Sequence, residues 1–146
     1  MTKNLLEELF DFIETTHKFQ KSNAEHSYQL AMVAWYLVTK HKLPLDLTLV
    51  IKYSLVHDLS EEKSRELLGE KFPEFKDVHH LINSHSKNTY EESKFIYALD
   101  KFLPMINEHK SKGKNLDKLI EAGQDTISKS EFVDRYLKEL IKSKSN

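Results

Sequence analysis

The chain has 146 residues, of which 39% are hydrophobic and 31% charged, with 3 Gly, 3 Pro, no Cys and a formal net charge of −1 at pH 7. This length suits one domain with a buried core, and so few turn-forming residues favour helices joined by short loops over a many-stranded sheet. The lack of cysteine excludes disulfides and thiolate metal sites, and the near-neutral charge provides no basic field to attract nucleic acid or anionic lipid. We therefore predict an all-α fold, a single domain over residues 1–146, with no nucleic-acid or membrane partner.

The first segment has apolar residues at helical spacing. We predict an amphipathic helix from Leu5 to Phe19 that contributes to the core, with its start marked by Thr2 or Asn4. Acidic residues occur throughout the first part of this segment, and it contains no long uncharged apolar run. Both features argue against a signal peptide or a membrane span, so we expect a cytoplasmic protein.

The second predicted helix, AEHSYQLAMVAWYL, follows a polar linker. Asn23 or Ser22 can cap its start, and the rings of Trp35 and Tyr36 within a nearly all-apolar run predict a central, well-buried helix. His26 lies on the same helical stripe as apolar residues further along. A single histidine at such a position is more often a satisfied core residue than a metal ligand.

Pro44 and Asp46 open a third predicted helix, DLTLVIKYSLVHD, which ends on His57 and Asp58. Adjacent residues on a helix point about 100° apart. Both side chains can still reach one ion beside the end of the helix, where the last turn loosens. Taken alone, the pair is equally consistent with a C-terminal helix cation beside an acidic neighbour. Glu61, four residues after His57, projects on the same side one turn further along.

A polar stretch predicts a further helix over residues 75–85, and this helix carries three histidines, His79, His80 and His85. Three histidines this close together in one helix are poorly spaced for a second metal. We interpret them as surface residues, although a contribution to a second metal stays open.

The next apolar stretch predicts a long helix from Glu91 to His109, with Asp100 on the same face as Ile96 and Leu103. A buried carboxylate is costly unless it is paired or binds a metal. Asp100 therefore requires a metal or a buried partner such as a histidine. Its neighbour Lys101 is either solvated or helps to hold a phosphate.

The remainder of the chain is simpler. The segment from His109 to Lys118 is locally basic around Gly113, and we interpret it as a loop, since it is too short and too poor in aromatic residues for a nucleic-acid patch. A last helix, capped by Ser128 or Ser130, closes the core.

Ionisable residues thus interrupt apolar helix faces at three separate places in the sequence. They are His26, the adjacent His57 and Asp58, and Asp100. Because burying each of them alone is costly, one common explanation is preferable, and the simplest is a single divalent metal held by all four. Imidazole and carboxylate ligands suit Mn²⁺, Co²⁺, Fe²⁺, Zn²⁺ or Mg²⁺, so the ligand types alone do not choose the ion.

The order His…His-Asp…Asp, with the flanks SNAEHSYQLAMVAWYL, LVHDLSE and ESKFIYALDKFLPMINE, resembles the HD superfamily of metal-dependent phosphohydrolases. Within it, the residues between about 19 and 115 look most similar to the branch of bacterial deoxynucleoside 5′-monophosphate phosphatases. The resemblance implies a bundle of about six to eight helices, Mn²⁺ or Co²⁺ as the favoured ion, and pairing of two copies. It also implies that Glu61 aims or deprotonates the attacking water beside Asp58.

The implied reaction is hydrolysis of a small phosphoester, a (deoxy)nucleoside 5′-monophosphate, to nucleoside and phosphate. Members of that branch tend to present an arginine ahead of the first histidine, whereas this chain has none before Arg65 and offers Lys18 and Lys21 instead. A lysine holds phosphate as a point charge without the two-pronged geometry of arginine. Lys101 is the next candidate. Two alternatives stay open: hydrolysis of a cyclic or hyperphosphorylated nucleotide, or a non-catalytic module that binds a metal or a partner.

Overall fold

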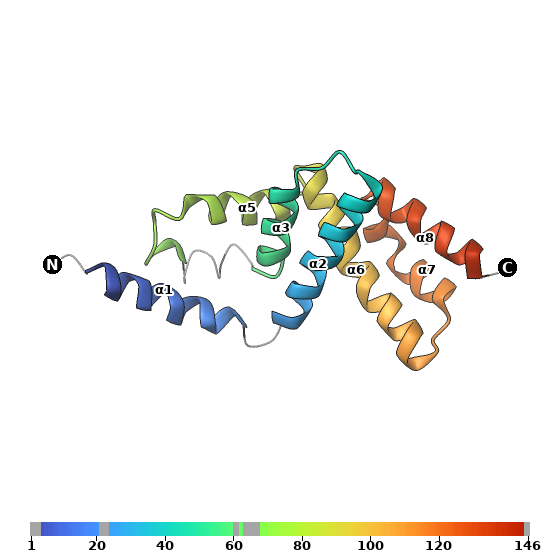
Figure 1. Cartoon of the computed structure of the whole chain (residues 1–146), viewed down its shortest axis with the longest axis horizontal. Helices are drawn as coiled ribbons and strands as arrows, with labels where there is room; N and C mark the ends of the chain where they lie inside the picture. Colours follow the sequence, from blue (N-terminus) through green and yellow to red (C-terminus); the bar gives the residue numbers. More distant parts are fainter. Residues whose placement is uncertain (1–3, 21–23, 60–61, 63–67, 145–146) are drawn as a thin grey trace.

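The computed structural model describes residues 4–20, 24–59, 62 and 68–144. These residues form helices joined by turns and irregular segments, without a strand among them. The all-α fold predicted from composition is confirmed. The helices, labelled as in Figure 1, are α1 (Leu5–Gln20), α2 (Ala24–His41), α3 (Leu47–Val56), α5 (Lys76–Ser86), α6 (Glu91–Lys112), α7 (Leu116–Ile127) and α8 (Glu131–Lys144). None of the described helices is long and apolar enough to cross a membrane.

Helix α6 is the centre of the bundle. It contacts α2, α3 and α5 as well as α7 and α8, while α1 and α8 lie at opposite ends of the molecule (Figure 1). Its inward face is apolar along most of its length, and Phe95, Ile96 and Leu99 are at most 1% exposed. Burial of these side chains holds the other helices around α6, because removing apolar area from water is the dominant favourable term in folding. Proline 104 lies inside this helix.

The helix starts predicted from capping residues are confirmed where the structure describes them. The Oδ1 atom of Asp46 accepts hydrogen bonds from the backbone N–H groups of Thr48 (2.9 Å) and Leu49 (3.3 Å) at the start of α3. Asn4 caps α1 and Ser130 caps α8 in the same way. These bonds satisfy backbone donors that a helix leaves unpaired at its first turn. Ser22 and Asn23 lie outside the described residues.

The interpretation of His109 to Lys118 as a loop is wrong, since only residues 113–115 lie between helices. Helix α6 continues to Lys112 and ends at Gly113, whose φ of 65° is the left-handed conformation that glycine adopts without strain. Helix α7 then begins at once, because the side chain of Asn115 accepts the backbone N–H of Lys118 at 3.2 Å. Buried apolar residues at helical spacing, Leu116, Ile120 and Ile127, anchor α7 on the bundle.

The predicted burial of the aromatic residues in α2 is also wrong. Trp35 is 48% exposed and Tyr36 is 56% exposed, and they continue a stripe begun by Tyr28 and Met32. The physical reason is that α3 and α6 cover only the opposite face of α2, where Leu30, Ala34, Leu37 and Val38 are buried.

The first helix contributes less to the core than its apolar spacing predicted. Its large apolar residues are more than half exposed: Leu5, Leu6, Leu9, Phe10 and Ile13. The ring of Phe12 makes the inward contacts, edge-on to Phe72 at 5.4 Å and tilted against Phe75 at 5.7 Å between ring centroids. An amphipathic pattern shows that a helix has an apolar side, but it does not show how much of that side another element covers.

Candidate metal centre

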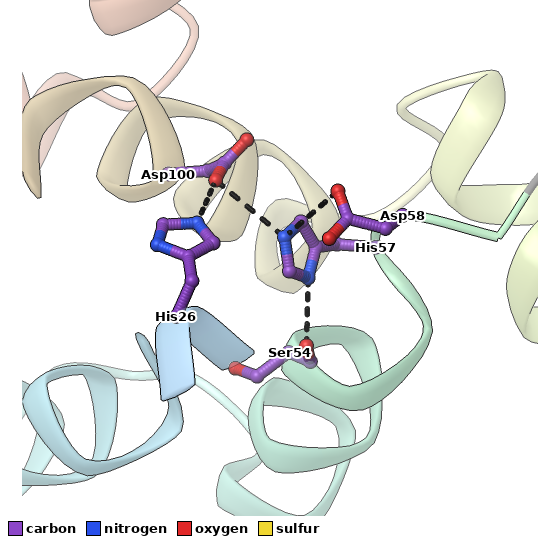
Figure 2. A network of polar contacts seen from close by, with 5 residues as sticks. All are labelled: His26, Ser54, His57, Asp58 and Asp100. Carbon is purple, nitrogen blue, oxygen red and sulfur yellow. Dashed lines mark hydrogen bonds and ion pairs between the residues drawn. The ribbon is translucent and has the colours of Figure 1, made fainter. Parts of the chain in front are cut away.

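Three helices deliver the four predicted ligands to one place. His26 lies in the first turn of α2, His57 caps the C-terminus of α3 with Asp58 directly after it, and Asp100 lies in the middle of α6. Figure 2 shows these side chains pointing toward one another. The arrangement depends on the packing of α2 and α3 against α6, which the apolar faces of the three helices produce.

The oxygen of Asp100 lies between the two histidines. The Nε2 atom of His26 is 2.6 Å from Oδ1 of Asp100, and Nε2 of His57 is 3.5 Å from the same oxygen (Figure 2). Because a carboxylate oxygen accepts, the imidazole of His26 donates its Nε2 proton in this contact. One carboxylate thus links the ligands of α2 and α3.

The imidazole of His57 is oriented by its own helix. Its Nδ1 atom is 2.7 Å from the backbone carbonyl of Ser54, and because a carbonyl can only accept, Nδ1 carries the proton. This leaves the lone pair of Nε2 facing the site. Such a bond from the other ring nitrogen to a backbone carbonyl is how proteins fix the tautomer of a metal-binding histidine.

The surroundings of that Nε2 atom fit a cation. The side chain of His57 is 3% exposed, and Nε2 is buried without a hydrogen-bond partner among the described residues. Its nearest polar neighbours are carboxylate oxygens, Oδ1 of Asp58 at 3.2 Å and Oδ1 of Asp100 at 3.5 Å. A lone pair facing two negative oxygens is unfavourable unless a positive charge lies between them. A divalent ion accepts electron pairs from all of these atoms at once.

The ligand atoms are close enough together to bind one ion. One atom from each of His26, His57 and Asp100 lies within 4.8 Å of the others. Asp58 lies outside this group of three, beside His57, and its side chain is 43% exposed. The structure therefore brings the four predicted ligands together as a partly buried set of three with Asp58 beside it, and Asp100, whose side chain is 39% exposed, is less buried than the sequence predicted.

Of the other predicted site residues, the structure describes only the side chain of Lys101. Glu61 and Lys21 lie outside the residues that the structure describes, and so does the side chain of Lys18 near the end of α1. Lys101 is exposed, and its aliphatic stem lies against Gly123 of α7. Their roles in catalysis and phosphate binding stay predictions.

The interpretation of His85 as a surface residue is wrong. It is 5% exposed, and its ring is stacked between Tyr53, at 5.3 Å between ring centroids, and Tyr97, at 4.3 Å. The sequence held a signal for this burial, because His85 follows Val78, Leu81 and Ile82 at helical spacing, and these three form the buried face of α5. His80 is exposed, as predicted, and His79 is half-buried.

The buried position of His85 changes its acidity. Burial, and to a smaller extent the neighbouring His57, lowers the pKa of its imidazole from the ordinary value of 6.5 to about 4, against a smaller opposing effect of Asp100. The physical cause is that the apolar surroundings disfavour the charged form. His85 is therefore neutral at pH 7, where one ring nitrogen donates a hydrogen bond and the other accepts.

This shift makes the stability of the fold depend on pH. Between pH 6.5 and pH 4 the unfolded chain binds a proton at His85 that the folded chain does not. The contribution of neutral His85 to the free energy of unfolding is therefore intact above pH 6.5 and is lost as the pH falls. The loss amounts to up to about 3 kcal/mol. We expect the free energy of unfolding in urea to fall more steeply over this range for the wild type than for His85→Phe. Equal slopes for the two proteins would contradict the assignment of a neutral, buried His85.

Comparison with known proteins bears on this site. A family model described as an HD domain matches residues 12–68, a segment that contains His26, His57 and Asp58. No curated protein and no solved structure gives a significant match. Over residues 12–68 the chain is thus similar to HD domains, which are typically divalent-metal-dependent hydrolases.

Proposed function

We propose that this HD-domain chain binds one divalent metal through His26, His57, Asp58 and Asp100 and hydrolyses (deoxy)nucleoside 5′-monophosphates to nucleoside and phosphate. The observation that supports it best is the buried Nε2 atom of His57, whose lone pair faces two carboxylate oxygens. The match to the HD domain supports the reaction class. The nucleotide substrate follows from the resemblance of the flanking sequences to the deoxynucleotidase branch.

The chemistry that the ion supplies when bound is a lowered pKa of water and compensation of negative charge on the phosphoryl group. The chain's own residues prepare for this. The Ser54 carbonyl holds the ring of His57 in the tautomer that a metal requires. His26 donates from Nε2 to Asp100 in this structure, so it can act as a ligand through this nitrogen only in the tautomer that carries the proton on Nδ1.

The remaining roles are assigned from the sequence. Glu61 would aim or deprotonate the attacking water, and Asp58 would act with it. Lys18, Lys21 and Lys101 are the candidates for holding the phosphate as point charges.

The ion and the oligomeric state are part of the same proposal. Mn²⁺ or Co²⁺ is favoured, because the resemblance points to them and mixed imidazole and carboxylate ligands suit them. Fe²⁺, Zn²⁺ and Mg²⁺ remain compatible with the ligand types.

Two copies of the chain pair in this proposal. The exposed apolar residues of α1, among them Leu5, Phe10 and Ile13, support this.

The test is a panel of phosphoesters assayed with each divalent ion in turn. We expect release of inorganic phosphate from 5′-monophosphates, faster from deoxynucleotides than from ribonucleotides, with Mn²⁺ or Co²⁺ and not with EDTA. Hydrolysis confined to a cyclic or hyperphosphorylated nucleotide would show that the proposed substrate is wrong and that the proposed reaction class is right. Metal binding without hydrolysis of any compound in the panel would instead support a non-catalytic module.

A further inference from the structure

Helix α5 is hydrogen-bonded to α3 and α6, two of the three helices that carry the candidate ligands, through two adjacent residues. The first is Ser84, which is 4% exposed and whose hydroxyl donates to the carbonyl of Leu81 at 3.1 Å. The Ser84 hydroxyl has only one proton, and it donates this proton to Leu81. The hydroxyl of Tyr53 is therefore the donor in the 2.7 Å hydrogen bond between Tyr53 and Ser84. Tyr53 is fully buried in α3.

The second residue is His85, which bonds α6. Its Nδ1 atom is 2.8 Å from the hydroxyl of Ser93, and that hydroxyl donates to the backbone carbonyl of His85 at 3.3 Å. Both contacts are satisfied when Nδ1 donates to Ser93 and Ser93 donates to the carbonyl. Ser93 is fully buried, so this reciprocal pair of hydrogen bonds is shielded from water. In the protein interior such bonds are electrostatically stronger than in water.

These contacts lie close to the metal ligands in the sequence of each helix. Tyr53 precedes His57 by four residues on α3, and Tyr97 precedes Asp100 by three on α6. Residues three or four apart lie on the same side of a helix. Ser93 lies a further four residues back on that side of α6. The ring of His85 therefore fills the space between the two helices one turn away from the ligands that they carry.

We propose that His85 is a positioning residue for the metal centre: stacked between Tyr53 and Tyr97 and bonded to Ser93, it fixes the separation of α3 and α6 and with it the separation of His57 and Asp100. This inference rests on the proposed function, because it assigns a role toward the metal that the site is proposed to bind. A core position that needed only volume would take an apolar residue, since burying an imidazole costs free energy that its hydrogen bonds only offset. The hydrogen bonds add direction, which fixes one arrangement of the two helices.

Two variants separate the contributions of the ring and its hydrogen bonds. His85→Phe keeps an aromatic ring between the tyrosines and removes both nitrogens, whereas His85→Asn keeps a donor for Ser93 and removes the stacked ring. Co²⁺ is titrated into the purified full chain and followed by its visible absorption, which reports ligand number and geometry. Supporting hydrogen bonds around a metal site are typically worth about 10- to 100-fold in affinity or activity. We therefore expect His85→Phe to bind Co²⁺ at least about 10-fold more weakly, with an altered absorption spectrum, and His85→Asn to recover part of that loss.

The matched control is His80→Phe, the same substitution in the same helix at an exposed histidine. It should bind Co²⁺ within about twofold of the wild type, as surface changes usually do little. In the phosphatase assay, His85→Phe should lower kcat by about 10-fold with KM within about twofold, since it displaces ligands and not the substrate. A His85→Phe variant that loses stability in urea but matches His80→Phe in Co²⁺ affinity and spectrum would overturn the positioning role.

Failure of this inference and failure of the proposed function give different results. If the wild type hydrolyses phosphoesters and His85→Phe matches His80→Phe in kcat and in Co²⁺ binding, the positioning role is wrong and the function stands. If the wild type binds Co²⁺ but hydrolyses nothing, the function is wrong. A weaker, spectrally altered Co²⁺ complex in His85→Phe would then still support the positioning role.

Discussion

Replacing Asp58 by Ala is expected to lower metal-dependent phosphatase activity by at least about 100-fold, because even outer partners of a metal ligand are commonly worth 10- to 100-fold. Asp58 lies 3.2 Å from Nε2 of His57, and its side chain is 43% exposed. Its loss would remove one of the negative ligands proposed to hold the ion. The fold should be unaffected, since the side chain is 43% exposed and contributes nothing to the apolar core.

The measurement combines phosphate release with urea denaturation of the same preparations. Asp77→Ala is the matched control, since Asp77 is also exposed and its carboxylate lies 2.8 Å from Nζ of Lys52. It should keep full activity, and both variants should lie within about 0.5 kcal/mol of the wild type in stability. Undiminished activity in a well-purified Asp58→Ala preparation would refute the catalytic role of the site.

Replacing Phe95 by Ala is expected to destabilise the fold by about 3–5 kcal/mol, a range typical of a large buried aromatic side chain cut back to a methyl group. Phe95 is 1% exposed on α6, and its ring lies 6.2 Å from that of Phe132 in α8. Removing it leaves a cavity at the centre of the bundle, and the lost contacts connect α6 with the C-terminal helix. Such a loss is a large part of the total stability of a small domain.

Phe10→Ala provides the control for this effect, because Phe10 is the same residue type and is 60% exposed on α1. At a protein concentration low enough for the chain to be monomeric, so that the proposed pairing through α1 does not contribute, its free energy of unfolding should change by no more than about 0.5 kcal/mol. The two variants are compared by urea denaturation in the presence of EDTA, so that metal binding does not contribute. A loss in Phe95→Ala as small as that in Phe10→Ala would show that α6 is not the central helix.

The sequence was most informative about the candidate ligands, because an ionisable residue within an apolar helix face is a local anomaly that can be recognised without a structure. His26 and Asp100 each interrupt an apolar helix face, and the structure brings them within 2.6 Å of each other. Capping residues could also be predicted, since the hydrogen bond that Asp46 accepts from Thr48 at the start of α3 involves only residues close in sequence. Features of this kind depend on chemistry within one turn of helix.

The features that could not be predicted depend on which elements meet. Trp35 and Tyr36 are as apolar as core residues, yet no described helix covers their side of α2, and spacing along one helix contains no information about its neighbours. His85 was misjudged for the complementary reason. It is polar in a polar stretch, and its burial depends on Tyr53, Tyr97 and Ser93 from two other helices.

The proline inside α6 has a consequence for the ligand that precedes it by one turn. Pro104 has no backbone N–H, so it cannot donate to the carbonyl of Asp100, the residue four positions earlier that an uninterrupted helix would bond. The backbone that carries the bridging carboxylate is therefore held by one helical hydrogen bond fewer than its neighbours. On one side of it, Phe95 and Ile96 fasten the helix to the bundle, and on the other, Met105 is buried near Gly123 of α7. The turn of α6 that carries Asp100 can therefore shift more easily than an uninterrupted turn, which would let this carboxylate adjust to the radius of the proposed ion.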